Sequence, residues 1–233
     1  MDVTALRVFI GYDEREAVSY YTLCHSLHTR SSIPLEIAPL NRGTLAEFYK
    51  RQRGPYDSTD FSITRFLVPF LCDYRGWALF MDCDMLCRAD VAELAEMICL
   101  RNWYKAVFVA KHDYTPRDEV KFLDAVQTKY RRKNWSSVML MNCERCKKLT
   151  PELVANAPGL SLHQFEWTTD EQIGDLPLEW NWLVDEYDFN PDAKLVHFTR
   201  GGPYFSEFAN CAYSNEWRAE YEGMTHVEQR KQG

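Results

Sequence analysis

Short apolar runs, each long enough for one buried strand, recur along the chain and alternate with segments of helical periodicity. The runs cover residues 6–10, 77–81, 106–110, 137–141 and 194–198. Residues 14–27 place apolar side chains on one helical face, so the chain opens as strand, tight loop and helix. This alternation predicts an α/β fold with a central, mostly parallel sheet flanked by helices.

Two further helices are expected between these runs. Residues 61–74 have a helical pattern that Asp60 can cap and that Pro69 is expected to kink or break. Asp90 is expected to cap a helix over residues 89–100. With 233 residues, 46% of them hydrophobic, the chain is long enough for one sizeable domain. We expect this domain to cover residues 1–213 and a polar tail to cover residues 214–233.

The net charge and the N-terminus limit the classes of function. A formal charge of −7 disfavours nucleic acid as a partner, so a bound phosphate would need a metal ion or local cations. The first residues have no basic segment followed by an apolar run, and no stretch approaches the roughly 20 apolar residues of a membrane span. A cytoplasmic location is the default expectation, with peripheral work at a membrane surface as an alternative.

The eight cysteines are spread along a chain of ordinary globular composition and are expected to be reduced thiols. Cys143 and Cys146 have the spacing of half a zinc site, but Cys83 and Cys87 are not a convincing second pair. Structural zinc and a redox role stay open as alternatives to buried thiols.

The motif Asp82-Cys83-Asp84 follows the apolar run 77–81 directly. Alternate residues of an extended segment point to the same side, so both carboxylates can face one point. Two such oxygen ligands at a strand end suit Mg²⁺ or Mn²⁺ shared with substrate phosphates. The alternative is an acidic turn with Asp84 in solvent.

His197 ends the last apolar run and is a candidate third ligand, which would favour Mn²⁺ over Mg²⁺. The alternative is a core histidine with its hydrogen bonds satisfied. Just after it, Gly201 lets the backbone approach a ligand closely, and the guanidinium of Arg200 can bind a phosphate.

Two earlier segments offer contacts for a nucleotide. After the first strand, Gly11 opens a loop in which Tyr12 can stack on a base and Asp13 can accept a hydrogen bond from base or ribose. The alternative for Asp13 is a helix N-cap. Arg65 can reach a phosphate or sugar, or form a surface ion pair.

Taken in order, these segments resemble the GT-A glycosyltransferases, a Rossmann-like fold, and most of all the family-8-like group of glycogenin and the bacterial lipopolysaccharide galactosyl- and glucosyltransferases. The similarity extends from Val8 to about Tyr204. It includes the opening strand and loop, a segment that contains an arginine, and the Asp-x-Asp motif. It also includes a strand with an asparagine at each end, an acidic segment before Leu-Pro-x-x-Trp-Asn, and a final His-Phe segment. These are residues 8–13, 62–66 with Pro69, 80–84, 134–142, 169–172, 176–181 and 197–204.

The resemblance implies a metal-dependent transfer of a hexose from a nucleotide diphosphate sugar, with UDP-glucose and UDP-galactose as the expected donors. It implies retention of the anomeric configuration, Ser62 and Arg65 as donor contacts, and an unidentified glycan, lipid-linked or protein acceptor. Gly202 stands where the family has a lysine, so Arg200 is expected to bind the diphosphate. The residues expected near the far face of the anomeric carbon are Asp170, Glu171 and Gln172.

Two other functions stay open at this point. A sugar-nucleotidyltransferase could also use Asp82 and Asp84, although the acidic Gly11-Tyr12-Asp13-Glu14 disfavours it. A catalytically inactive, glycosyltransferase-like binding protein would be expected to lack a metal ligand, and all three candidates are present.

Overall fold

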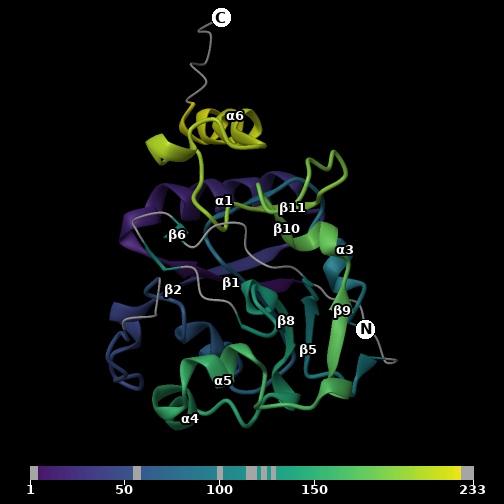
Figure 1. Cartoon of the computed structure of the whole chain (residues 1–233). Coiled ribbons are helices and arrows are strands. Elements are labelled where there is room, and N and C mark those ends of the chain that lie inside the picture. The colour runs from purple at the N-terminus through teal and green to yellow at the C-terminus, as the bar shows by residue number, and fades with distance from the viewer. Residues whose placement is uncertain are drawn as a thin grey trace, which may run out of the picture.

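A six-stranded sheet forms the centre of the computed structural model, which describes residues 5–54, 59–98, 102–113, 120–121, 125–126 and 130–226 (Figure 1). The strand order is β2-β1-β3-β8-β5-β9. Only β8 runs antiparallel to its neighbours, so the predicted mostly parallel sheet is confirmed. The strands are β1 (Leu6–Tyr12), β2 (Leu35–Asn41), β3 (Trp77–Met81), β5 (Val107–Ala110), β8 (Val138–Asn142) and β9 (Ile173–Leu176).

A second, three-stranded sheet has the order β10-β11-β4. Its central strand, β11, is parallel to β10 and antiparallel to β4. The chain passes from β3 of the large sheet to β4 of the small one through the Asp82–Asp84 turn. The small sheet consists of β10 (Trp182–Leu183), β11 (Leu195–His197) and β4 (Met85–Cys87), and a separate pair consists of β6 (Val120–Lys121) and β7 (Ala125–Val126).

In Figure 1, α1 and α6 lie above β1, and α4 and α5 lie below it. Helix α6 covers residues that the sequence analysis assigned to the polar tail. It packs on α1, and its buried Glu220 pairs with Arg30 of α1. The division at residue 213 stays a prediction. The α-helices are α1 (Ala17–Arg30), α2 (Val68–Leu71), α3 (Ala92–Ala95), α4 (Pro151–Asn156), α5 (Gly159–His163) and α6 (Ser214–Thr225). The 3₁₀ turns are η1 (Glu14–Glu16), η2 (Arg42–Leu45), η3 (Thr64–Leu67), η6 (Trp135–Ser137), η7 (Cys143–Arg145), η8 (Asp170–Gln172), η9 (Leu178–Asn181) and η10 (Ser206–Phe208).

The expected helix over residues 61–74 is wrong in extent. The structure has η3 followed by the single turn α2, with Pro69 in the first turn of α2, as the predicted break requires. Asp60 does not cap it, because η3 begins after Ile63 without a side-chain cap. Asp90 does accept the Ala92 N–H (2.9 Å), but the helix is only Ala92–Ala95 within the described part of the predicted range, which ends at residue 98.

Both faces of the central strands are covered, as a mostly parallel sheet requires. All five residues of β8 and the last four of β3 are buried. The cysteines that the structure describes are free thiols, as predicted. Within the described residues, Cys143 and Cys146 are not part of a cluster that could hold a metal ion, and no helix is long and apolar enough to cross a membrane.

Candidate functional site

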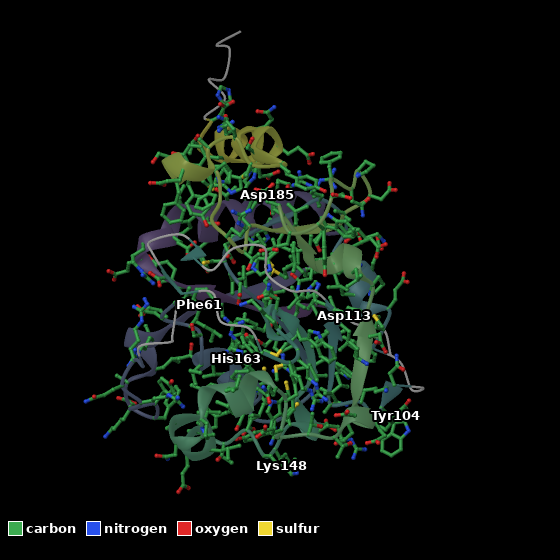
Figure 2. The ribbon with its side chains drawn as sticks, in the orientation of Figure 1. Phe61, Tyr104, Asp113, Lys148, His163 and Asp185 are labelled. Atoms are coloured by element: carbon green, nitrogen blue, oxygen red, sulfur yellow. The ribbon has the colours of Figure 1, made fainter. Side chains whose placement is uncertain are left out.

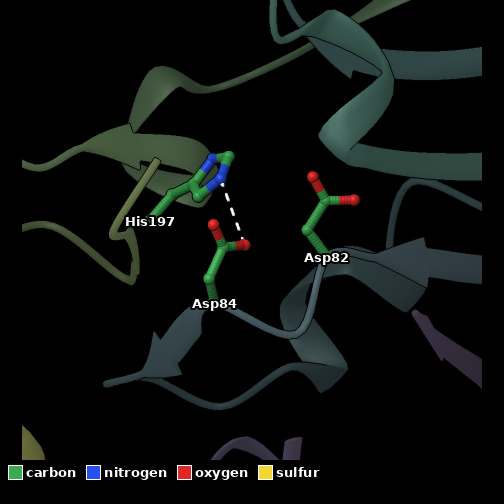
Figure 3. A group of neighbouring side chains, drawn as sticks. All are labelled: Asp82, Asp84 and His197. Atoms are coloured by element: carbon green, nitrogen blue, oxygen red, sulfur yellow. Dashed lines mark ion pairs between the residues drawn. The ribbon is translucent and has the colours of Figure 1, made fainter. Parts of the chain in front are cut away.

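The structure brings the three predicted metal ligands together where the two sheets meet (Figure 3). Asp82 directly follows β3, Asp84 precedes β4, and His197 is the last residue of β11. One ligand atom from each lies within 4.8 Å of the others, and His197 Nε2 is 3.3 Å from Asp84 Oδ1. Asp84 is therefore nearly buried beside an imidazole and is not the solvated residue of an acidic turn.

Hydrogen bonds from several elements hold the Asp82–Asp84 turn. The Asp82 N–H donates to Ser137 O before β8 (2.9 Å), and the Phe198 N–H after β11 donates to Asp84 O (2.8 Å). Ser19 Oγ on α1 donates to the carbonyl of Cys83 (2.8 Å). These bonds fix the backbone from which the two carboxylates project.

Asn181 orients the imidazole of His197. Its NH₂ group donates to Ser137 Oγ (2.9 Å) and to Asn134 O (3.1 Å), so its oxygen is left to accept a hydrogen bond. That oxygen lies 3.0 Å from His197 Nδ1. This assigns the proton to Nδ1 and turns the lone pair of Nε2 toward Asp84, as in many histidine metal ligands. Sequence reasoning gave Asn181 no role, although it lies in the Leu-Pro-x-x-Trp-Asn segment.

Arg65 forms a buried ion pair, not the surface pair considered from the sequence. Its Nη1 lies 2.9 Å from Asp82 Oδ1 and also donates to Ser136 O (2.9 Å). The guanidinium packs 5.0 Å from the centre of the Phe80 ring. Arg65 therefore fixes one carboxylate of the cluster, and its contact with a donor stays a prediction.

The predicted loop beginning at Gly11 is wrong, because Gly11 and Tyr12 are the last two residues of β1 and pair with β2. This end of β1 is tightly packed. A side chain at Gly11 would meet the ring of Phe61 at 2.3 Å, and Tyr12 packs edge-on against Tyr20. Asp13 is buried and caps η1, accepting the Arg15 N–H (3.0 Å). Burial alone would raise the pKa of Asp13, but hydrogen bonds from Arg15 and from the Asp60 N–H outweigh it and lower that pKa.

The N-cap alternative for Asp13 is therefore what the structure shows. A base or ribose contact by residues 11–13 stays a prediction. Ser62 is also engaged locally, since its Oγ accepts the Thr59 N–H (3.0 Å).

The loop after β11 is too closely packed for a side chain at position 202. A Cβ there would lie 2.3 Å from the ring of Tyr204, and the Tyr204 hydroxyl donates to the fully buried carboxylate of Glu16 (2.7 Å). The preceding Gly201 has φ = 139°, a conformation that favours glycine. Arg200 lies half-buried in the same loop.

The structure does not bring Asp170, Glu171 and Gln172 to the cluster. They form η8, directly before β9, which runs parallel to β5. Gln172 O accepts the Ala106 N–H at the start of β5 (2.9 Å), whereas Asp82 follows the end of β3.

Because β5 and β3 run in the same direction, η8 lies at the N-terminal ends of the parallel strands, whereas Asp82 lies at their C-terminal ends. Figure 2 labels residues at the two ends of β5, Tyr104 before it and Asp113 after it. Asp170 and Glu171 are exposed, and Asp170 pairs with Arg132. A catalytic role for these residues lacks support from this placement.

A further histidine lies beside the cluster. His112 follows β5, is buried, and its Nδ1 lies 2.8 Å from the hydroxyl of Tyr187. Burial and the nearby His197 lower the pKa of His112 to about 3, so it is neutral at physiological pH. Trp135 Nε1 donates to the His112 carbonyl (2.9 Å), which ties this loop to the segment before β8.

No protein-family model matches the chain. One curated relative, Protein CDI of Arabidopsis thaliana, is 45% identical over an alignment of 225 residues that covers 93% of this chain and 86% of the relative. The chain belongs to the family of Protein CDI. At this identity and coverage, the fold described above is expected for Protein CDI as well.

Solved glycosyltransferases share this CDI-family fold. The bifunctional glycosyltransferase WbbM aligns with a TM-score of 0.61 at 16% identity over 94% of this chain, which spans only 52% of the WbbM chain. The galactosyltransferase LgtC aligns with a TM-score of 0.60 at 11% identity, over 96% of this chain and 98% of LgtC. GlyE of Streptococcus pneumoniae TIGR4 aligns with a TM-score of 0.58 at 12% identity, over 94% of this chain and 60% of the GlyE chain. The fold is therefore that of the GT-A-like glycosyltransferases, while membership of the family-8-like group stays a prediction.

Proposed function

We propose that this CDI-family chain is a metal-dependent glycosyltransferase that transfers a hexose from a nucleotide diphosphate sugar. One observation carries the proposal: in a glycosyltransferase fold, Asp82, Asp84 and His197 converge at the end of β3. Ligands of open α/β sheets bind beyond the carboxyl ends of the strands, which is where this cluster lies.

The three side chains fit a divalent cation. Two carboxylates and one imidazole are suitable ligands for Mn²⁺, and also for Mg²⁺. Asn181 holds the imidazole in the tautomer that ligation needs, and Arg65 fixes the carboxylate of Asp82. When bound, the ion would neutralise negative charge on the departing nucleoside diphosphate.

Other parts of the proposal rest on the resemblance and on position in the chain. Arg200 is proposed to bind the diphosphate, and Gly11, Tyr12, Asp13, Ser62 and Gly201 are proposed to line the donor site. UDP-glucose or UDP-galactose is the proposed donor, and retention is the proposed stereochemical outcome. The acceptor is a glycan, a lipid-linked glycan or a protein, and the proposed location is the cytoplasm or its membrane surface.

The test is a screen of uridine, guanosine and thymidine diphosphate hexoses, with Mn²⁺ or with chelator. We expect release of free UDP from a UDP-hexose, in Mn²⁺ only, and thermal stabilisation by UDP with Mn²⁺. Release of pyrophosphate in the presence of a sugar phosphate and a nucleoside triphosphate would instead indicate a sugar-nucleotidyltransferase. Binding without turnover over a broad panel of acceptors would indicate an inactive binding protein.

A further inference from the structure

Glu16 is fully buried, but it is neither a candidate metal ligand nor a proposed donor contact. It is the last residue of η1, and the Tyr204 hydroxyl, on the loop after β11, donates to its Oε1 at 2.7 Å. Burial and the carboxylates of Glu16 and Asp84 raise the pKa of Tyr204 well above its ordinary value, so the hydroxyl stays protonated and remains a donor. Burying a carboxylate is unfavourable unless its charge is hydrogen-bonded, so a pair between two such distant segments requires an explanation.

The two elements that carry this pair also hold the turn with the metal ligands, residues 82–84. One helical turn after Glu16, Ser19 Oγ on α1 donates to the carbonyl of the middle residue of that turn (2.8 Å). At the start of the loop after β11, the Phe198 N–H donates to the carbonyl of its last residue (2.8 Å). The turn is therefore bonded to α1 and to the loop after β11, and the Tyr204–Glu16 hydrogen bond joins the loop to the start of α1 directly.

The loop 198–204 is consequently fixed at both ends. Its first residue bonds to the metal-ligand turn, and its last residue bonds to Glu16. Between them the Gly201 N–H donates to Phe198 O (2.8 Å), and Gly201 has φ = 139°. Arg200 lies half-buried between the two fixed ends, so its position depends on both of them.

We infer that Tyr204 and Glu16 are positioning residues for the donor diphosphate: their hydrogen bond holds the loop that carries Arg200 and Gly201 in its binding conformation. This rests on the proposed function, which places the diphosphate at that loop. A hydrogen bond from a phenol to a carboxylate is charge-assisted and holds the loop more firmly than packing of the ring alone. A loop that is already in its binding conformation loses less conformational freedom when the ligand arrives, which favours affinity.

The test is calorimetric titration of UDP, in MnCl₂, into the wild type and Tyr204→Phe. This change keeps the ring, which packs 5.5 Å from the Trp217 ring and against Gly202, and removes only the hydroxyl. We expect UDP to bind roughly 10-fold more weakly, the scale of one lost hydrogen bond to a charged group. Mn²⁺ affinity should change little, because the metal-ligand turn keeps its own hydrogen bonds. The matched control is Tyr21→Phe on α1, where the tyrosine is exposed and UDP should bind as to the wild type.

Thermal unfolding of the same variants separates positioning from stability. If the pair only stabilises the fold, Tyr204→Phe unfolds at a lower temperature but binds UDP with wild-type affinity well below it, and the inference is overturned while the proposed function stands. If Tyr204→Phe does not fold, Glu16→Gln and Glu16→Met replace it. The glutamine still accepts the hydrogen bond and should retain most of the UDP affinity, whereas the methionine should lose it, and equal affinities of the two would overturn the inference. A wild-type protein that binds no UDP in Mn²⁺ overturns both this inference and the proposed function.

Discussion

Two clusters of buried charge join distant parts of the chain, and they differ in how the charge is balanced. Between α6 and α1, the carboxylate of Glu220 contacts two basic residues, Arg30 at 2.7 Å and His25. Between the two sheets, Asp82 and Asp84 are gathered around His197, with Arg65 paired to one of them. The first cluster has one acid between two bases, and the second has two acids close together.

The difference indicates which cluster is structural and which binds a ligand. Burial would raise the pKa of Glu220, but Arg30 and His25 outweigh it and hold that pKa below its ordinary value. The protein itself therefore stabilises this carboxylate. Two neighbouring carboxylates repel each other, and a divalent cation relieves that repulsion. The sheet-to-sheet cluster is accordingly expected to gain from a ligand, and the helix-to-helix cluster is not.

The largest effect is expected for Asp84→Ala. Loss of this ligand should lower metal-dependent turnover by roughly 10³-fold or more, because the charge of the leaving group is no longer neutralised. The fold should survive, since removing one of two neighbouring carboxylates also removes repulsion. Turnover in Mn²⁺ and thermal unfolding in chelator are the two measurements. Full activity of Asp84→Ala would show that the ligand assignment is wrong.

Arg200→Ala should follow, with a decrease in turnover of roughly one to three orders of magnitude, the range for losing one transition-state charge stabiliser. Arg200→Lys should restore part of it, since an ammonium cannot form the two-pronged contact of a guanidinium. Steady-state kinetics with a UDP-hexose gives the measurement. Arg75→Ala, on an exposed arginine, is the control. Unchanged kinetics of Arg200→Ala would remove this residue from the site.

Asn181→Ala should weaken Mn²⁺ binding by roughly 10- to 100-fold, as expected when the partner that orients a histidine ligand is lost. Asn181→Asp keeps an oxygen for His197 Nδ1 and should lose less. Electron paramagnetic resonance of free Mn²⁺ measures the affinity directly. Equal affinities of wild type and Asn181→Ala would mean that His197 needs no such support, or that it is not a ligand.

The smallest effect is expected for a change in the Glu220 cluster between α6 and α1. Glu220→Gln should lower the free energy of unfolding at pH 7 by about 1–3 kcal/mol, the range for hydrogen bonds to a charged group. Since the folded pKa of Glu220 lies below its ordinary value of 4.5, this contribution is present above that pH and is lost as the pH falls through the folded pKa.

Urea unfolding at pH 7 and in a series below pH 4.5 measures this dependence. The difference between wild type and Glu220→Gln should shrink as the pH falls, and Glu222→Gln on the exposed side of α6 should change little. A difference that is the same at every pH would contradict the ion-pair interpretation. Turnover should not change in either variant, in contrast to Asp84→Ala.

Local sequence was sufficient to predict β3 and β11, the strands next to Asp82 and His197, but not β4, which follows Asp84. The apolar run 77–81 is β3, and Asp82 follows it directly. Residues 82–84 form a bend between the two sheets, so the two carboxylates converge through this bend and not through the pleat of one strand. β2 was missed because Pro39 interrupts its apolar pattern. A proline is tolerated there because β2 is an edge strand, whose outer side needs no hydrogen-bond donor.

Long-range order was not predictable in the same way. The exposed position of Asp170 and Glu171 depends on β9 pairing parallel to β5, far from β3, and no local pattern encodes that strand order. Asn181 faces His197 because Ser137 Oγ and Asn134 O, in the turn before β8, hold its NH₂ group.

The arrangement of the ligands on two sheets has a mechanical consequence. Asp82 follows a strand of the six-stranded sheet, whereas Asp84 precedes β4 and His197 ends β11, both in the small sheet. An ion shared by all three would act as a removable cross-link between the sheets. At a hundredfold excess over its dissociation constant, such a ligand stabilises the folded state by about 2.7 kcal/mol. Amide hydrogen exchange in β4, β10 and β11 would then become slower as the metal concentration rises. The rigidity of the small sheet would therefore depend on how much of the ion is available.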